Sequence, residues 1–380
     1  MRLAADTRAP WAAQPLVLAA AGAVAAALAA AATAHGLRML ALLGLGVLLG
    51  AALYLFSFGF ASAYRRLLEQ RDAQGVRAQL LMLAAATLLF APLLAQGSWF
   101  GRDIAGAVAP AGVPVAAGAF LFGLGMQLAG GCGSGTLYSA GGGQLRMAIT
   151  LAAFCAGSFW ASLHMDAWSV LPTLPPIALG ERWGWPAAVG AQLLVLAALY
   201  ALLGTWQGKA ARWRLSWPLA AGALALAVLN LLTLITAGHP WSITWAFALW
   251  GAKLARIVGW EPAQHAFWSA DFQRGALEAS VFADVTSVMD FGLVLGAFAA
   301  AGLAGSFRLR YRLSLREALT ALLGGLAMGY GARIAYGCNI GAFFSGVAST
   351  SLHGWLWIAA ALPGCWVGLW LLRRFSRQEY

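Results

Sequence analysis

The chain has 380 residues, of which 61% are hydrophobic and 10% charged, and its mean hydropathy is +0.75. This composition excludes a soluble domain and indicates a helical protein with many membrane spans. The formal charge of +11 would suggest a nucleic-acid partner in a soluble protein. Here the Lys and Arg residues cluster in short loops between apolar runs, which is typical of cytoplasmic loops. We therefore expect a lipid bilayer around the chain and no nucleic-acid partner.

The N-terminal segment 1–36 has two interpretations. It begins with a short polar stretch that contains Arg2 and Arg8, and residues 14–34 form an alanine-rich apolar run. The run is long enough to cross a membrane, and we favour an uncleaved first span. The alternative is a signal peptide whose small-residue cleavage site is 32–34.

Apolar runs predict nine further spans, separated by turns and charged loops. The expected spans are 37–60, 78–96, 113–146, 147–164, 186–204, 217–236, 277–305, 318–352 and 353–372. The segment 241–258 is apolar and rich in Trp but carries Lys253 and Arg256, so we expect a partial or interfacial helix there. The basic loops place both termini and residues 61–77, 209–214 and 306–317 in the cytoplasm, provided that 113–146 crosses only once.

Two stretches of the chain resemble each other, 129–139 (AGGCGSGTLYS) and 335–345 (AYGCNIGAFFS). Aligned without a gap, they share five pairs: Ala129/Ala335, Gly131/Gly337, Cys132/Cys338, Gly135/Gly341 and Ser139/Ser345. Glycines that interrupt a helix at membrane depth are tolerated where protein or a water-lined cavity surrounds them. The unit of span, interrupted helix and span occurs in opposite orientation in the halves 37–214 and 215–380. We predict an all-α polytopic membrane protein with inverted-topology repeats and two broken helices that meet near the midplane.

A helix broken at membrane depth exposes free N–H groups at its positive end, which suits an anion. A cysteine adds a soft, weak S–H donor. We therefore predict a substrate path at both breaks, whose residues are Cys132, Cys338, Gly131, Gly135, Ser139, Gly337, Gly341 and Ser345. A single Gly-Cys-x-x-Gly string would equally suit helix packing, and the second copy favours function. Cys155 and Cys365 lie in unbroken spans, and we expect them to be small buried residues.

Three of the ionisable residues inside expected spans are candidates for a role: Asp284, Asp290 and Arg333. Charges at this depth are costly and are candidates for function. We expect a structural ion pair between Arg333 and one aspartate. The alternative for the other aspartate is a proton or coupling-ion role, beside the path, because a carboxylate on the path would repel an anion.

The cysteine and histidine pattern predicts neither a metal site nor a cofactor. The four cysteines contain no C-x-x-C pair, and the five histidines form no ligand pair at helical spacing.

The two Gly-Cys breaks and the stretch Phe282–Gly292 (FADVTSVMDFG) resemble the YeeE/YedE family of membrane transporters for sulfur-containing ions. The resemblance extends over roughly residues 40–372 and implies thiosulfate uptake, in which cysteines pass the anion along by S–H hydrogen bonds. Cys132 and Cys338 match two family cysteines. A third family cysteine corresponds to the stretch Tyr54–Arg66 (YLFSFGFASAYRR), which has none here, so Ser57 or Ser62 is the candidate replacement.

The resulting prediction is an inner-membrane permease, not an enzyme, for thiosulfate or a related small sulfur or selenium anion. Two alternatives remain open. The first is a membrane thiol oxidoreductase, which usually needs a close cysteine pair. The second is a membrane anchor whose basic loops dock a cytoplasmic sulfur-carrier protein, and coupling to a sulfurtransferase partner stays open with it.

Overall fold

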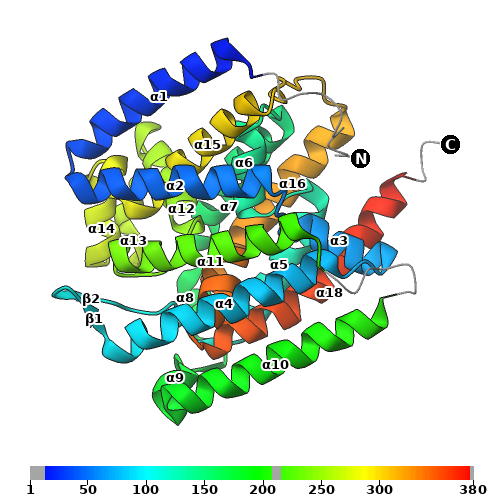
Figure 1. The fold of residues 1–380 in the computed structure, drawn as a ribbon. Helices are drawn as coiled ribbons and strands as arrows, with labels where there is room; N and C mark the ends of the chain where they lie inside the picture. Colours follow the sequence, from blue (N-terminus) through cyan, green and yellow to red (C-terminus); the bar gives the residue numbers. More distant parts are fainter. Residues whose placement is uncertain (1–12, 208–214, 377–380) are drawn as a thin grey trace.

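The computed structural model describes residues 13–207 and 215–376, and it is built almost entirely of helices (Figure 1). Within these ranges, ten helical segments are long and apolar enough to cross a membrane. Most of the long helices run side by side along one direction (Figure 1). The prediction of an all-α polytopic membrane protein is confirmed.

The elements follow one another with short connections. The first half of the chain forms α1 (Pro15–Thr33), α2 (Leu37–Leu55), α3 (Phe60–Gln70), α4 (Gln74–Gln96), α5 (Val113–Ala129), α6 (Gly133–Gly141), α7 (Leu145–Ser162), α8 (Met165–Ser169), α9 (Leu179–Trp183) and α10 (Trp185–Trp206). The second half forms α11 (Trp217–Ala237), α12 (Thr244–Ile257), η1 (Pro262–Gln264), α13 (Ala266–Ser269), α14 (Asp271–Glu278), η2 (Val281–Ala283), α15 (Val285–Leu303), α16 (Leu315–Ile334), η3 (Asn339–Phe344), α17 (Ser345–Ala348) and α18 (Leu352–Ser376). Two antiparallel strand pairs complete the description: β1 (Ser98–Trp99) with β2 (Arg102–Asp103), and β3 (Ala111–Gly112) with β4 (Thr173–Leu174).

Two predicted segments differ from the structure in an informative way. The span expected at 277–305 begins only at Val285, because Asp284 is the N-cap of α15 and its carboxylate accepts a hydrogen bond from Ser287 N at 2.8 Å. The partial helix expected at 241–258 is α12, which is shorter than the expected segment. Its face around Phe247 is buried and packs on α7.

The centre of the molecule is a close antiparallel crossing of α5 and α16. Gly118 packs on the backbone of Gly331, and Gly125 packs on that of Gly324, where a Cβ would not fit. Small residues allow helix backbones to approach this closely in a membrane. The crossing brings the ends of both helices into the protein interior.

The helices around this crossing exchange partners. α18 packs along α5, and α7 packs along α16. Gly123 of α5 lies against the carbonyl of Ala361, and Gly329 of α16, its equivalent in the gapless alignment, lies against the carbonyl of Phe154. The helix before each Gly-Cys stretch thus packs on the long helix that comes after the other stretch: α5 packs on α18, and α16 packs on α7. In the same way, α2 packs on α15 and α11 packs on α4.

α18 ends at the right of Figure 1, and α1 begins near the top of the view, close to the end of α15. The start of α1 is joined to the end of α15 by Gln14 N, which donates to Gly302 O at 3.0 Å. The end of α18 reaches α3 through an ion pair of 3.3 Å between Arg373 and Glu69. Ala73, between α3 and α4, donates its N–H to the Gln207 side chain at 3.3 Å.

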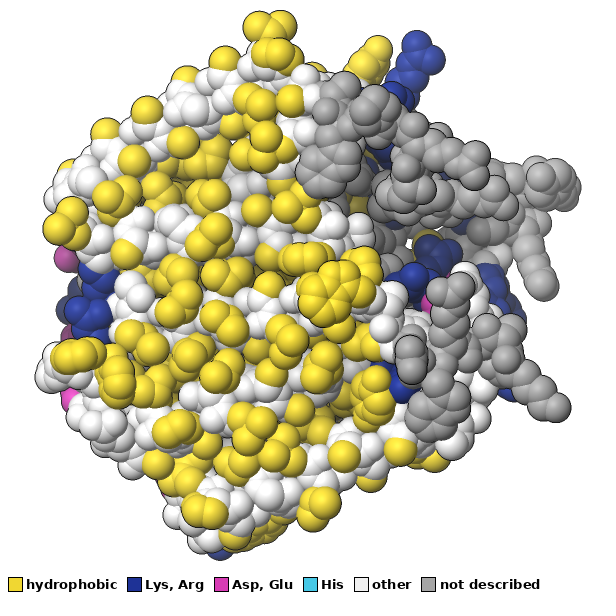
Figure 2. All heavy atoms as spheres, in the orientation of Figure 1, with side chains coloured by type: hydrophobic (Ala, Val, Ile, Leu, Met, Phe, Trp, Pro, Cys, Tyr) yellow, Lys and Arg dark blue, Asp and Glu magenta, His cyan; other side chains and the backbone are white. Residues whose placement is uncertain are grey.

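The expected cytoplasmic loops 61–77 and 306–317 lie at the end of the bundle where α18 ends, and 97–112 lies at the other. In Figure 2, Lys and Arg side chains appear at the two ends of the molecule, whereas the visible lateral face is apolar. This distribution fits a chain that crosses a bilayer along its helices. The basic loop 209–214 and Arg2, Arg8 and Arg377 lie outside the described residues.

Candidate substrate path

The first interruption, residues 130–132, separates α5 from α6. Gly130 turns the chain with a φ of +82°, a conformation that favours glycine. Cys132 then caps α6: its Sγ accepts a hydrogen bond from Gly135 N at 3.4 Å and lies 3.4 Å from the Ser134 hydroxyl. The thiol is therefore fixed at the first turn of a helix that begins inside the protein.

The second interruption, residues 335–338, separates α16 from η3 and has the same design. Gly337 adopts a φ of +149°. Cys338 caps η3, and its Sγ accepts from Ile340 N at 3.4 Å. The indole of Trp357, in α18, donates to the carbonyl of Gly337 at 3.2 Å and holds the turn in place.

The two capped helix starts meet. A Cβ placed on Gly133, the first residue of α6, would lie 3.3 Å from Cys338 Sγ and 3.7 Å from Thr244 Cγ2 at the start of α12. Cys132 and Cys338 are each only 1% exposed. Because the first N–H groups of a helix lack intrahelical partners, this arrangement brings two positive helix ends and two thiols together in the interior.

Polar side chains from distant elements surround this point. Asn339 Nδ2 donates to the Tyr64 hydroxyl at 3.4 Å, while Asn339 Oδ1 has no hydrogen-bond partner among the described residues. The Trp241 indole N–H is also buried without a partner there. The backbone of Trp241 is held by two side chains, since Asn230 Oδ1 accepts from its N–H at 2.8 Å and the Ser345 hydroxyl donates to its carbonyl at 2.8 Å.

The structure brings most of the predicted path residues to the two interruptions. Gly131 and Gly135 lie beside Cys132, and Gly341 lies beside Ser242, whose Oγ would be 3.2 Å from an added Cβ. Ser139 and Ser345 are the exceptions, because each lies seven residues, or about 10 Å of helix, beyond its cysteine. Ser345 is also engaged in the bond to Trp241.

Sequence comparison agrees with the resemblance drawn from the two breaks. A family model described as sulphur transport matches residues 57–367. The chain belongs to this family. The resemblance to YeeE/YedE transporters is thereby confirmed.

Several curated proteins are similar to this chain. The thiosulfate transporter TsuA of Spirochaeta thermophila is 28% identical over 358 residues, which cover 87% of this chain and 97% of that protein. TsuA of Escherichia coli is 24% identical over 307 residues, or 67% of this chain and 73% of that protein. The probable transporter YedE of Escherichia coli is 35% identical over 144 residues, so the chain matches 35% of the length of that relative.

In the stretch 54–66, where we expected a replacement for a third family cysteine, the two serines and the tyrosine lie in different environments. Ser57 and Ser62 are both exposed, and the Ser62 hydroxyl donates to Gly59 O at 3.1 Å within its own turn. The buried polar group of this stretch is the Tyr64 hydroxyl, which reaches Asn339 next to Cys338. Sequence reasoning missed Tyr64, although it lies inside the stretch that the family resemblance singled out.

The ion pair expected for Arg333 does not form. Within residues 13–207 and 215–376 no ion pair joins Arg333 to Asp284 or Asp290; its guanidinium lies 5.1 Å from the ring centre of Phe267 in α13. The last turn of α16 faces α13, whereas both aspartates belong to α15 and its cap. Asp284 accepts from the Trp245 indole at 3.0 Å in addition to capping α15.

The two remaining cysteines pack inside regular helices. Cys155 of α7 lies against Gly251 of α12, and Cys365 of α18 lies against Gly123 of α5. All four cysteines are free and buried.

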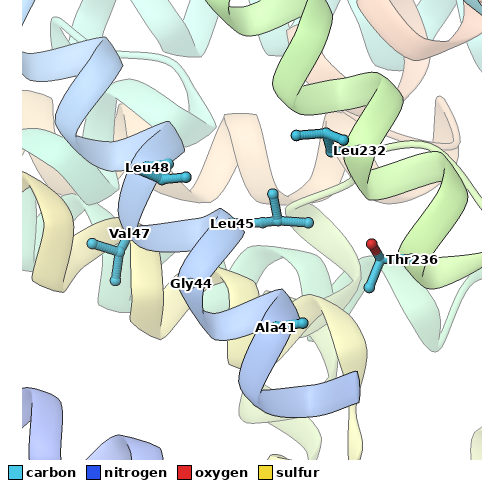
Figure 3. A pocket seen from close by; sticks show the side chains of 7 residues that line it. All are labelled: Ala41, Gly44, Leu45, Val47, Leu48, Leu232 and Thr236. Atoms are coloured by element: carbon cyan, nitrogen blue, oxygen red, sulfur yellow. The ribbon is translucent and has the colours of Figure 1, made fainter. Parts of the chain in front are cut away.

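A separate recess of about 550 Å³ lies between α2 and α11 (Figure 3). Its lining consists of Ala41, Gly44, Leu45, Val47, Leu48, Leu232 and Thr236. Leu48 and Leu232 are exposed on the lateral surface of the bundle. The recess is therefore a lipid-facing groove with one hydroxyl, and it has no charged group that could bind an anion.

Proposed function

We propose that this protein is an inner-membrane permease that takes up thiosulfate or a related small sulfur-containing anion between Cys132 and Cys338. The observation that carries the proposal is the meeting of two cysteine-capped helix starts at Gly133. The similarity to a protein named thiosulfate transporter over 97% of its length supports the same substrate class.

The chemistry of the meeting point suits such an anion. Free N–H groups at two helix starts favour negative charge, and thiol groups donate weakly to a polarisable sulfur or oxygen. A buried indole N–H without a partner, such as that of Trp241, costs roughly 1–3 kcal/mol. An anion that accepts from it would recover this energy, so the orphaned donor supports a ligand at this place.

The meeting point also lacks a fixed positive charge among the residues described there. Arg333 packs on Phe267 instead of turning toward the thiols. A path must bind its ion strongly enough to admit it and weakly enough to release it. Neutral donors meet both needs, whereas a buried guanidinium would hold a dianion.

We further propose that the halves 37–214 and 215–380 form inverted repeats, with both termini in the cytoplasm and residues 1–36 as an additional N-terminal segment. The exchange of packing partners at the equivalent residues Gly123 and Gly329 supports this relation. The basic residues of the segments 61–77 and 306–317, next to the start of α1 and the end of α18, support the orientation.

The test is uptake of labelled thiosulfate into proteoliposomes, with sulfate as the comparison substrate. Cys132→Ala and Cys338→Ala should each abolish uptake and leave the protein folded, because a small residue fits a glycine-lined turn. Serine at either position should perform little better than alanine, since its hydroxyl is shorter and less polarisable. The matched controls Cys155→Ala and Cys365→Ala should be mild. Near-normal uptake by the Cys132→Ala, Cys338→Ala double variant would refute the thiol path.

One observation favours a second candidate, a thiol oxidoreductase, because the start of α6 brings the two capping cysteines close together. That activity requires a disulfide or a mixed disulfide during turnover. Mass spectrometry of the working protein after alkylation distinguishes the two: the permease keeps both thiols reduced throughout uptake, and the oxidoreductase does not.

A further inference from the structure

A buried carboxyl on α15 has no part in the path described above. Asp290 is 0% exposed, and neither of its oxygens has a hydrogen-bond partner among the described residues. An ionised carboxylate in an apolar interior without a partner is very costly, so such a group holds a proton. By this argument Asp290 is a neutral acid, and it lies in α15, one of the helices that are long and apolar enough to cross a membrane.

The position of Asp290 places it beside the path. One turn later on α15, the carbonyl of Val294 lies against Gly141 of α6. One turn earlier, Ser287 accepts a hydrogen bond from the Trp250 indole of α12 at 2.9 Å. The carboxyl thus lies on the face of α15 that is turned toward α6 and α12.

The starts of α6 and α12 meet at the thiols, since Thr244 and Cys338 both adjoin Gly133. α15 contacts both of these helices, and Asp290 lies on the face that α15 turns toward them. Asp290 is therefore on the side of α15 nearest the helices that meet at the thiols, and it has no hydrogen bond to them.

No cation from the neighbouring elements reaches this carboxyl. The titratable groups on elements packed against α15 are Arg38 and Tyr54 at the two ends of α2, Tyr138 of α6, and Lys253 and Arg256 of α12, together with Asp284, which caps α15 itself. Arg38 donates to the carbonyls at the end of α11, and Lys253 and Arg256 donate to carbonyls at the end of α14. α1 and η2 carry no titratable side chain.

The charge of the proposed substrate requires compensation. Thiosulfate is a dianion at neutral pH, and the cytoplasm is electrically negative. A membrane potential of about 100 mV lowers the equilibrium internal concentration of a dianion that moves alone by roughly three orders of magnitude. One proton that moves with the anion halves the transported charge and couples uptake to the pH gradient.

We propose that Asp290 carries a proton inward with each anion that passes Cys132 and Cys338. The carboxylate binds one proton from the outer side to form the neutral acid, and it releases the same proton to the cytoplasm before the carrier resets. No electron is transferred and no covalent bond to the anion forms. This inference rests on the proposed permease function and adds its energy source.

The experiment separates exchange from accumulation. Both assays use proteoliposomes that contain the full-length protein and a lumenal pH dye. The exchange assay has thiosulfate on both sides of the membrane at equal pH. The accumulation assay has thiosulfate outside, with the outside more acidic than the lumen. The wild type should exchange labelled thiosulfate, accumulate it under the gradient, and acidify the lumen only when thiosulfate is present. Asp290→Asn should exchange at a rate within about twofold of the wild type but accumulate no more with the gradient than without it. The control Glu278→Gln, at an exposed position, should match the wild type in both assays.

Three results would overturn the inference. Gradient-driven accumulation by Asp290→Asn at the wild-type level would show that this carboxyl carries no proton. A wild-type protein that exchanges thiosulfate but does not acidify the lumen when it takes up thiosulfate under the gradient would refute the proton role. This result needs no variant, so the inference can be tested even where Asp290→Asn does not fold. Absence of exchange in the wild type would instead reject the permease function on which the inference rests.

Discussion

An alanine at Gly133 should stop transport while sparing the fold. Its methyl group would lie 3.3 Å from Cys338 Sγ, 3.7 Å from Cys338 Cβ and 3.7 Å from Thr244 Cγ2. The closest of these distances is tight but lies short of a clash, so the thiol must give way by only a few tenths of an ångström. The methyl group then occupies the space between the two helix starts, where the anion is expected to pass.

The energies can be compared term by term. Gly133 does not have a positive φ, so alanine is unstrained there and gains about 1 kcal/mol of helix propensity over glycine. Overpacking of a tight contact costs about 1–3 kcal/mol. The net change in the free energy of unfolding should therefore stay within about 2 kcal/mol. Loss of the space for the anion should lower uptake at least about tenfold, which is about 1.4 kcal/mol of binding or barrier energy.

Initial rates of thiosulfate uptake in proteoliposomes and thermal unfolding of the purified protein measure the two effects separately. Gly44→Ala is the matched control, because no heavy atom lies within 4 Å of the added Cβ. That variant should equal the wild type in both measurements. A folded Gly133→Ala protein that transports at the wild-type rate would contradict the placement of the path between the two helix starts.

Three further outcomes are expected. Trp357→Phe leaves the buried carbonyl of Gly337 without its donor, which should lower the free energy of unfolding by about 1–3 kcal/mol and slow uptake. The control Trp366→Phe, at an exposed position, should change neither quantity. Tyr64→Phe removes the hydroxyl that accepts from the amide beside the second thiol, and uptake should fall while the thermal transition shifts little. Topology reporters fused after Arg71 and after Arg312 should both report the cytoplasm. Both positions lie at the same end of the bundle, so opposite signals from the two reporters would contradict the structure.

The turns at the two Gly-Cys stretches have a local signal in the sequence. Glycines around one cysteine within an apolar run leave few conformations except a turn, and Gly130 and Gly337 adopt such turns. The cap on α15 also had a local signal, since Asp284 is followed three residues later by Ser287, although we predicted an intramembrane charge there.

The contacts across the fold were not predictable in the same way. The ion pair of Arg333 was inferred from opposite charges in neighbouring spans, but charge alone does not say which way the last turn of α16 faces. Phe267, its actual neighbour, belongs to a four-residue helix in a connection. Tyr64 of α3 contacts Asn339, the first residue of η3, and Trp241, in the turn before α12, contacts Ser345 of α17. No spacing in the sequence links them to these residues.

The lack of a cation at the meeting point among residues 13–207 and 215–376 and the presence of the Asp290 carboxyl have one physical explanation under the proposed function. A transport path for a dianion needs some compensation for the transported charge, and a buried arginine would supply it permanently. Permanent charge lowers the free energy of the bound anion and slows its release by the same amount. A proton on a neighbouring carboxyl supplies compensation that travels with the anion and leaves with it. The helix starts and thiols can then remain weak donors, and the direction of transport is set by the proton gradient instead of by the affinity of the path.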